Sequence, residues 1–418
     1  MLVSILIESN SNVLNVYLCA MLKGNKYRIY PNKAQAELID KHIGACRFVF
    51  NLALETKSYA YTGHRKSLTC FDLMNQLPEL KKECEWLREI DSQALQQSVI
   101  NLDKAFTAFF KGHASFPNFK SKKKGVQSFR NPHGNHVDVK DGKLYQPKFK
   151  EGIKIVIDRQ FEGEIKNTTI SRTPTGKYFV SILTDNHKEL PKKKPVKEST
   201  AVGIDLGLSH FIITSEGIKV ENPKHLRKAM FHLKYLQRQA SKKVKGSSNR
   251  KKANLKVALC HEKISNQRKD FLHKLSNEIT NQYDTLCFED LNISGMTKNH
   301  KLAGAITDAS WGEFVRQVEY KSEWKGKTIL QIPTFEPSTK LCHVCGAINH
   351  TLTLKDRGWV CVNCETVHDR DINAAKVIKQ YCINNSGGGL HRPKSVEQPK
   401  TLVGALKQKN KILGQSPK

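Results

Sequence analysis

Three acidic residues occupy sequence settings in which a carboxylate can bind a metal ion. Asp205 interrupts an apolar, strand-like run, Glu289 lies near the end of a second such run, and Asp371 precedes a helical pattern. Hard carboxylate oxygens suit Mg²⁺ or Mn²⁺ rather than Zn²⁺. Two such ions roughly 4 Å apart can activate water and stabilise the leaving oxygen of a phosphodiester. We therefore predict that these three residues are catalytic and bind Mg²⁺ or Mn²⁺.

The runs around the first acid favour one fold without excluding another. Residues 201–208 and 211–214 have the pattern of the first hairpin of an RNase H fold, where an Asp on the central strand faces the metal site. The Asp-x-Gly sequence at Asp205 also occurs in the sugar-kinase-type nucleotide site of the actin-like fold. The order of the three acids favours the nuclease. Their neighbours Asp290 and Asp369 are candidates for helix caps or for groups that support the ligands.

Four cysteines form a C-x2-C-x15-C-x2-C array made of Cys342, Cys345, Cys361 and Cys364. Four thiolates at this spacing predict a closed, structural zinc site, a zinc ribbon. His343, His350 and His368 lie nearby, and we interpret them as surface or packing residues. The ribbon falls between the second and third acids, so removal of zinc is expected to unfold it locally and to loosen Asp371.

The charge balance indicates a polyanionic partner. The 418 residues include 69 Lys and Arg against 39 Asp and Glu, a formal net charge of +30. Residues 224–274 are the most basic part, with sixteen Lys or Arg against Glu262 and Asp270 and a turn predicted at 245–249. One apolar face at helical spacing would pack while the other follows a phosphate backbone, as in an RNA–DNA channel. The alternative is a solvated helical hairpin. The apolar positions are Leu226, Met230, Leu233, Leu255, Leu259, Phe271 and Leu275.

The N-terminal half divides into a helical and a β-rich part. Asn32 is placed to cap the first of several helical patterns. Phenylalanines and cations alternate over residues 109–130, which suits phosphate contact with base stacking, unless the phenylalanines belong to the core. Short β-branched runs between 131 and 184 predict a small β-barrel or sandwich.

The ends of the chain carry separate expectations. Residues 1–20 lack Lys and Arg and are broken by polar residues, so neither a signal peptide nor a membrane span fits. The patterned sequence begins at Met21, where we expect natural translation to start. The cysteines outside the ribbon show no pairing rhythm, which is typical of a reducing compartment. The basic tail 390–418 is expected to be disordered until it meets nucleic acid.

Several motifs together resemble one family. They are Gly203-Ile204-Asp205-Leu206-Gly207, Glu289-Asp290-Leu291, Pro337-Ser338-Thr339-Lys340-Leu341-Cys342 with its ribbon, His368-Asp369-Arg370-Asp371-Ile372-Asn373-Ala374-Ala375, and Phe116-Pro117-Asn118-Phe119-Lys120. From about Met21 to Ile378 the chain resembles the TnpB (OrfB) proteins of bacterial insertion sequences, relatives of type V CRISPR effectors. Two positions depart from the pattern: Glu365 follows Cys364 where Gly is common, and Val377 replaces a frequent Asn.

The resemblance implies an RNA-guided DNA endonuclease with a RuvC-like site. Its partners would be a guide RNA from the transposon end and target DNA, with sequence read mainly by base pairing. A cytoplasmic, nucleoid-associated bacterial protein is expected, with no membrane contact. A transposase that performs strand transfer, or a DNA-binding regulator of transposition, is the alternative.

The expected fold class is α+β multidomain. It combines an RNase H-like (RuvC-type) nuclease domain and its inserted zinc ribbon with an N-terminal helical unit and a small β-barrel. The expected bounds are 1–20 for an upstream extension, 21–31 for the first barrel (wedge) strand, 32–130 for the helical recognition domain, 131–190 for the barrel, 191–200 for a linker, 201–335 for the nuclease, 336–367 for the ribbon, 368–389 for the end of the nuclease, and 390–418 for the tail.

Overall fold

The computed structural model describes residues 20–123, 126–334, 338–353 and 356–386. The expected upstream extension, apart from its last residue, and the basic tail lie outside these residues. The chain divides into two compact units, 1–190 with 232–263 and 191–231 with 264–418.

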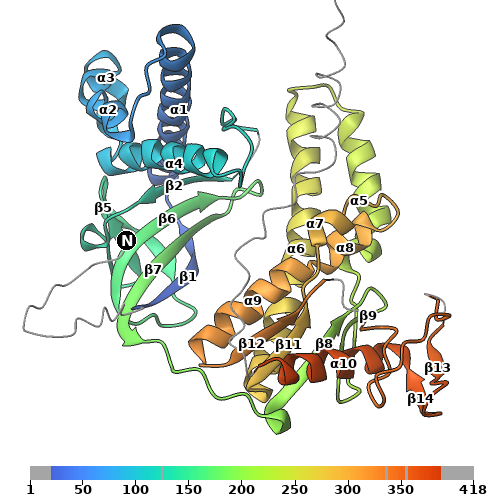
Figure 1. Cartoon of the computed structure of the whole chain (residues 1–418). Helices are drawn as coiled ribbons and strands as arrows, with labels where there is room; N and C mark the ends of the chain where they lie inside the picture. The colour runs from blue at the N-terminus through green and yellow to red at the C-terminus, as the bar shows by residue number, and fades with distance from the viewer. Residues whose placement is uncertain (1–19, 124–125, 335–337, 354–355, 387–418) are drawn as a thin grey trace, which may run out of the picture. The chain divides into compact units, whose positions relative to one another are not determined.

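After its first strand, the N-terminal unit continues with helices (Figure 1). They are α1 (Lys33–His64), α2 (Cys70–Asn75), α3 (Leu77–Glu83), the 3₁₀ turn Glu85–Glu89 and α4 (Ser92–Phe110). The predicted cap is confirmed, because the Asn32 side chain accepts a hydrogen bond from the Gln35 amide at 2.8 Å and Gln35 returns one to the Asn32 amide. This reciprocal pair fixes where the long helix α1 begins.

A seven-stranded antiparallel sheet follows. Strand β1, which precedes the helices in sequence, lies in its middle. The strands are β1 (Ala20–Tyr30), β2 (Gln127–Asn131), β3 (Asp138–Lys140), β4 (Lys143–Gln146), β5 (Phe149–Val156), β6 (Glu164–Arg172) and β7 (Tyr178–Glu189). Their order is β2-β6-β7-β1-β5-β4-β3. Since no pairing joins β2 to β3 among the described residues, the sheet does not close, and the expected barrel is not shown.

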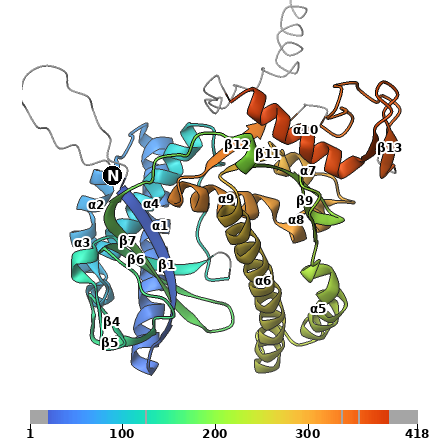
Figure 2. The same ribbon diagram turned by 90° about the horizontal axis from the view of Figure 1, so that it is seen from below.

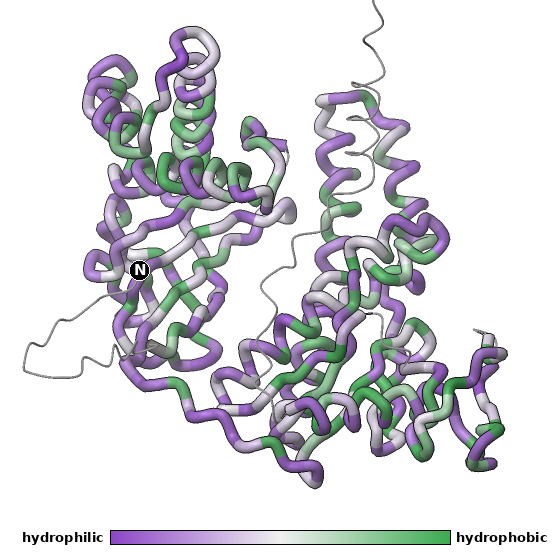
Figure 3. Tube along the Cα trace, viewed as in Figure 1, coloured by the Kyte–Doolittle hydropathy of each residue, from purple (hydrophilic) through white to green (hydrophobic). Residues whose placement is uncertain are grey.

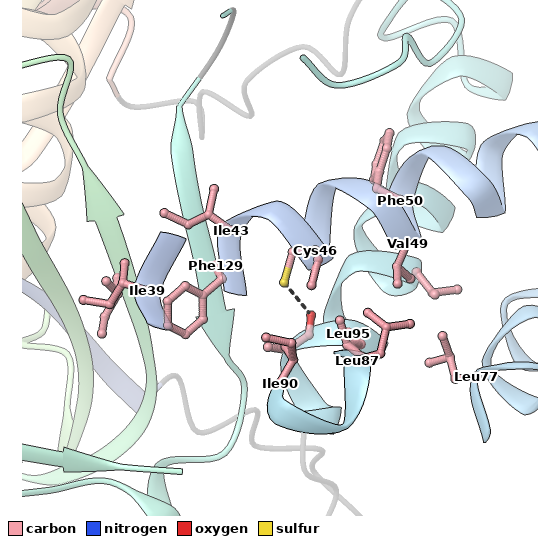
Figure 4. Close-up of a cluster of buried hydrophobic side chains, with 14 of the residues drawn as sticks. Ile39, Ile43, Cys46, Val49, Phe50, Leu77, Leu87, Ile90, Leu95 and Phe129 are labelled. Atoms are coloured by element: carbon pink, nitrogen blue, oxygen red, sulfur yellow. Dashed lines mark hydrogen bonds between the residues drawn. The ribbon is translucent and has the colours of Figure 1, made fainter. Parts of the chain in front are cut away.

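One hydrophobic core joins these helices to this sheet. It runs from Ile39 and Leu95 in the helices to Phe129, Ile153 and Val180 in the strands. Figure 4 shows the helical side of this core, where the buried Cys46 thiol contacts the Ala94 carbonyl oxygen at 3.4 Å. Strand β2 crosses the expected boundary at 130/131. The helical part and the β-rich part therefore share one interior.

The second unit is built on a five-stranded mixed sheet. Its strands are β8 (Ala201–Leu206), β9 (His210–Thr214), β10 (Lys219–Glu221), β11 (Thr285–Glu289) and β12 (Thr328–Ile332), in the order β10-β9-β8-β11-β12. β8 and β9 form the predicted hairpin, while β11 runs parallel to both β8 and β12. The central position of β8 and β11 places the ends of both strands side by side.

Helices cover both faces of this sheet (Figure 2). Val202, Ile204 and Phe288 point to one face and pack with Phe211 and Phe314. The helices are α7 (Ile293–Met296), α8 (Ala303–Ala309), α9 (Trp311–Trp324) and α10 (Arg370–Asn384). Because side chains alternate along a strand, Gly203, Asp205 and Glu289 belong to the opposite face, where α10 lies.

Two long helices form the basic hairpin. α5 (His225–Ser241) and α6 (Ser248–Gln282) are joined near the predicted turn. The residues of both helices are largely hydrophilic (Figure 3). Leu233 and Leu275 are buried as expected, but Leu255 and Leu259 are exposed. None of the helices that the structure describes is long and apolar enough to cross a membrane.

Candidate active site

The first two predicted acids end neighbouring parallel strands. β8 and β11 pair in the register Gly203 with Cys287 and Ile204 with Phe288. One residue further along, Asp205 and Glu289 follow in the same order on the face that α10 covers. Their carboxylates therefore come from adjacent strands at the same edge of the sheet.

A glycine lets the third acid approach them. A Cβ atom on Gly203 would lie 1.9 Å from the Ala375 carbonyl oxygen and 2.8 Å from the Lys379 amide nitrogen. Any side chain here would push α10 away from β8. Gly203 thus allows the backbone of α10 to lie directly on the strand that carries Asp205.

The first turn of α10 presents Asp371. Asp369 is the N-cap, because its Oδ1 accepts from the amides of Asp371 and Ile372, each at 3.1 Å. Its Oδ2 pairs with Lys219 on β10 at 2.6 Å. The expectation that Asp369 is a structural cap is confirmed. The cap therefore fixes the first turn of α10, which carries Asp371.

Two arginines hold the Asp371 carboxylate. Arg370 donates to Oδ1 from Nε at 3.0 Å, with its Nη2 at 2.9 Å, and Arg357 donates to Oδ2 at 3.4 Å. Arg370 is buried, whereas Arg357 is exposed. Nothing in the sequence pattern singled out these arginines, although Arg370 precedes the acid directly. They balance part of the negative charge gathered here.

The three carboxylates share one electrostatic environment. Burial, and then the charges of Asp371 and Glu289, raise the pKa of Asp205 to about 7, against a smaller opposing effect of Arg370. Burial also raises the pKa of Glu289. A buried carboxyl that resists ionisation beside other carboxylates favours a divalent cation, which stabilises the charged form. The residue types and their field fit Mg²⁺ or Mn²⁺, and the catalytic role stays a prediction.

The four cysteines converge more tightly than the acids. Their sulfur atoms all lie within 4.8 Å of one another, with Cys342 to Cys364 at 3.7 Å and Cys345 to Cys361 at 3.6 Å. Tetrahedral zinc with bonds of about 2.3 Å separates its sulfurs by roughly 3.8 Å. Among the described residues this is the group whose ligand atoms are close enough to hold one ion. The cluster therefore fits zinc.

A short hairpin and two histidines support the cluster. β13 (Gly358–Val360) pairs with β14 (Val367–Asp369). His368 is buried against Trp359 at a ring distance of 4.6 Å, and its Nε2 lies 3.1 Å from Cys342 Sγ. His343 packs on His368. The ligand group consists of the four cysteines, so neither histidine belongs to it, as we expected for surface or packing residues.

Comparisons with known proteins cover most of the chain. Residues 181–300 match a family model described as "Probable transposase" of the OrfB type. Residues 311–378 match a "Cas12f1-like, TNB domain", and residues 21–66 match a "Helix-turn-helix domain". In this chain residues 21–66 form most of strand β1 and one long helix, α1.

Relatives resemble the chain over most of their own length. A protein of Streptomyces pristinaespiralis named "Putative RNA-guided DNA endonuclease" is 39% identical over 84% of this chain and 87% of its own. The "Putative RNA-guided DNA endonuclease InsQ" of Escherichia coli is 31% identical over 85% and 91%. Among solved structures, the cryo-EM structure of a Cas12f1–sgRNA–target DNA complex shares the fold, with a TM-score of 0.54 and 15% identity over 83% of each chain. The chain belongs to the TnpB (OrfB) family of insertion-sequence proteins.

Proposed function

We propose that this protein is a transposon-associated, RNA-guided DNA endonuclease. The observation that carries the proposal is that Asp205 and Glu289 follow each other on neighbouring strands of the second sheet, and that burial, and then the charges of Asp371 and Glu289, raise the pKa of Asp205. Two relatives that cover most of the chain are named for this activity.

In the proposed reaction, water attacks a DNA phosphodiester in a RuvC-like site. Mg²⁺ or Mn²⁺ bound by the carboxylates, two ions in the form we favour, would supply the Lewis acid and an activated water. Asp205 must lose its proton before its oxygens can bind a cation. Arg357 lies beside Asp371 with most of its side chain exposed, so it is placed to meet a phosphate once a cation replaces it at the acid.

The nucleic-acid partners follow from charge and from the family. A net charge of +30 and sixteen cations over residues 224–274 provide the phosphate-binding surface. We propose a guide RNA from the transposon end and a target DNA as ligands, with the helices of 32–130 and the sheet of 131–190 holding RNA and reading the motif beside the target. Such an enzyme would act in the bacterial cytoplasm, at the nucleoid.

The test is guide-dependent cleavage. The chain is expressed with its flanking genomic DNA, the co-purifying RNA is sequenced, and the complex is given matched and unmatched plasmids with Mg²⁺. Asp205→Ala should reduce cutting by at least roughly 100-fold and retain RNA binding. Glu221→Ala, an exposed acid on β10 of the same sheet, is the matched control. Absence of bound RNA together with affinity for transposon-end DNA would contradict the proposal.

A second candidate is a transposase. It is favoured by the description of the family model that matches residues 181–300. A strand-transfer assay with labelled transposon ends separates the two, because a nuclease leaves cut ends unjoined.

A further inference from the structure

Asn373 connects the zinc ribbon to the catalytic helix. Its side chain is buried, with 1% of the residue exposed, and makes three hydrogen bonds. Oδ1 lies 3.0 Å from the His343 amide nitrogen, which donates to it, and 2.9 Å from His343 Nδ1. Nδ2 donates to the Leu341 carbonyl oxygen at 2.7 Å. Both the oxygen and the nitrogen of the Asn373 amide therefore form hydrogen bonds with residues of the ribbon.

The partners of Asn373 flank a zinc ligand. Leu341 and His343 are the chain neighbours of Cys342, so the amide holds the backbone on either side of that cysteine. On its own side, Asn373 lies in the first turns of α10, two residues after Asp371. One side chain thus joins the first cysteine knuckle to the helical turn that carries the third acid.

Asparagine is suited to this place by its chemistry. The position needs an acceptor for the His343 amide and a donor for the Leu341 carbonyl at the same time. An amide side chain offers both at a fixed spacing, whereas a carboxylate offers acceptors alone and an alanine neither. Loss of the amide would leave the His343 amide and the Leu341 carbonyl at the knuckle without these partners, which weakens the contact between ribbon and helix.

We propose that Asn373 is a positioning residue that couples zinc binding in the ribbon to the placement of Asp371. Zinc orders the knuckle at Cys342, the knuckle holds the Asn373 amide, and the amide holds the start of α10. The consequence for cleavage rests on the proposed nuclease function, but the coupling itself does not. A buried polar group that merely completes local packing is the competing explanation.

Hydrogen–deuterium exchange of the full-length chain tests the coupling. In the wild type, stripping zinc should speed exchange of the peptide 369–376 about tenfold, the scale on which outer partners of a metal site act. Asn373→Ala should show this faster exchange with zinc bound, and stripping should then add little. Release of zinc to a competing chelator should also be about tenfold faster in this variant. Neither readout depends on nuclease activity.

Two further variants keep the test decisive. Asn373→Asp keeps the shape and the acceptors but loses the donor to Leu341, so it should change both rates in the same direction by a smaller factor. Asn385→Ala removes an exposed Asn at the far end of α10, whose Nδ2 donates to the Tyr381 carbonyl oxygen at 2.8 Å, and should change neither. If Asn373→Ala fails to fold, Asn373→Asp decides. Wild-type rates in the folded variants, or an undiminished effect of zinc stripping in them, overturn the proposal.

Discussion

The zinc ribbon and the carboxylate site meet at the same helix but are assembled in opposite ways. The four cysteines lie within residues 342–364, and their sulfurs all come within 4.8 Å of one another. The three acids come from β8, β11 and α10, and like charges oppose their approach. The geometry of the cysteine site therefore depends on one short segment. The geometry of the carboxylate site depends on how the strands and helices of the whole unit pack.

The largest expected effect comes from breaking that packing. Gly203→Ala places a methyl group where 1.9 Å remains to the Ala375 carbonyl oxygen, so α10 must move away from β8. We expect a loss of about 1–3 kcal/mol in the free energy of unfolding and a fall in cleavage of roughly 100-fold. Chemical denaturation and plasmid cutting measure these, and zinc should stay bound at one ion per chain.

The control for this substitution is another strand glycine. A Cβ atom on Gly24 of β1 would meet nothing within 4 Å. Gly24→Ala should therefore leave cleavage unchanged. Full activity and stability of Gly203→Ala would show that the approach of α10 to β8 does not govern the site.

The converse experiment breaks the ribbon. Cys342→Ser removes one zinc ligand, so metal analysis should find less than one zinc per chain while the circular dichroism of the helices persists. Cleavage with restored Mg²⁺ should fall about tenfold. Cys260→Ser, outside the ribbon on α6, should keep both zinc and activity. Undiminished cutting by zinc-free protein would show that the carboxylate site does not depend on the zinc ribbon.

An effect on stability that depends on pH is expected from the proton on Asp205. Its pKa is about 7 in the folded chain against an ordinary 3.8, so the folded state holds a proton that the unfolded state loses between these pH values. Without Mg²⁺, stability from this group is therefore present at low pH and is lost as pH rises to 7 and above. Asp205→Asn should be more stable than wild type at pH 8, by at most about 4 kcal/mol, and similar at pH 4.

Thermal unfolding with zinc retained measures this difference, and saturating Mg²⁺ should reduce it. Glu221→Gln is the control, because Glu221 is exposed on β10, which β9 separates from the strand that carries Asp205. A pH-independent difference between Asp205→Asn and wild type would contradict the shared electrostatic environment of the acids.

The smallest effect concerns the ribbon backbone. Glu365 has a φ of +55°, a left-handed conformation that favours glycine. This accounts for the Gly that the family commonly has after the last cysteine. Glu365→Gly should stabilise the ribbon by roughly 1 kcal/mol and slow zinc loss to a chelator several-fold. Asp141→Gly, at a φ of +51° in the β3–β4 turn, should not change zinc loss.

Local signals account for what the sequence predicted well. The Asn32 and Asp369 caps, the β8–β9 hairpin and the cysteine cluster each depend on residues close together in the chain. The turn of the basic hairpin was likewise visible in its Gly and Ser residues. Such features follow from the chemistry of a few neighbouring residues.

Features that depend on distant partners were not predictable. Strand β12 and helix α9 went unrecognised, because their burial arises from β11 and α6, which lie elsewhere in the chain. The contact of Gly203 with α10 likewise joins residues far apart in sequence. The exposure of Leu255 and Leu259 shows that helical spacing alone does not say which face packs.

The most direct test of the central claim is Mn²⁺ binding to the full-length, zinc-loaded chain, measured by electron paramagnetic resonance. If Asp205, Glu289 and Asp371 form one metal site, alanine at each should weaken Mn²⁺ binding by roughly tenfold or more, while Glu221→Ala should not. Equal Mn²⁺ affinity in wild type and in all three variants would contradict the account.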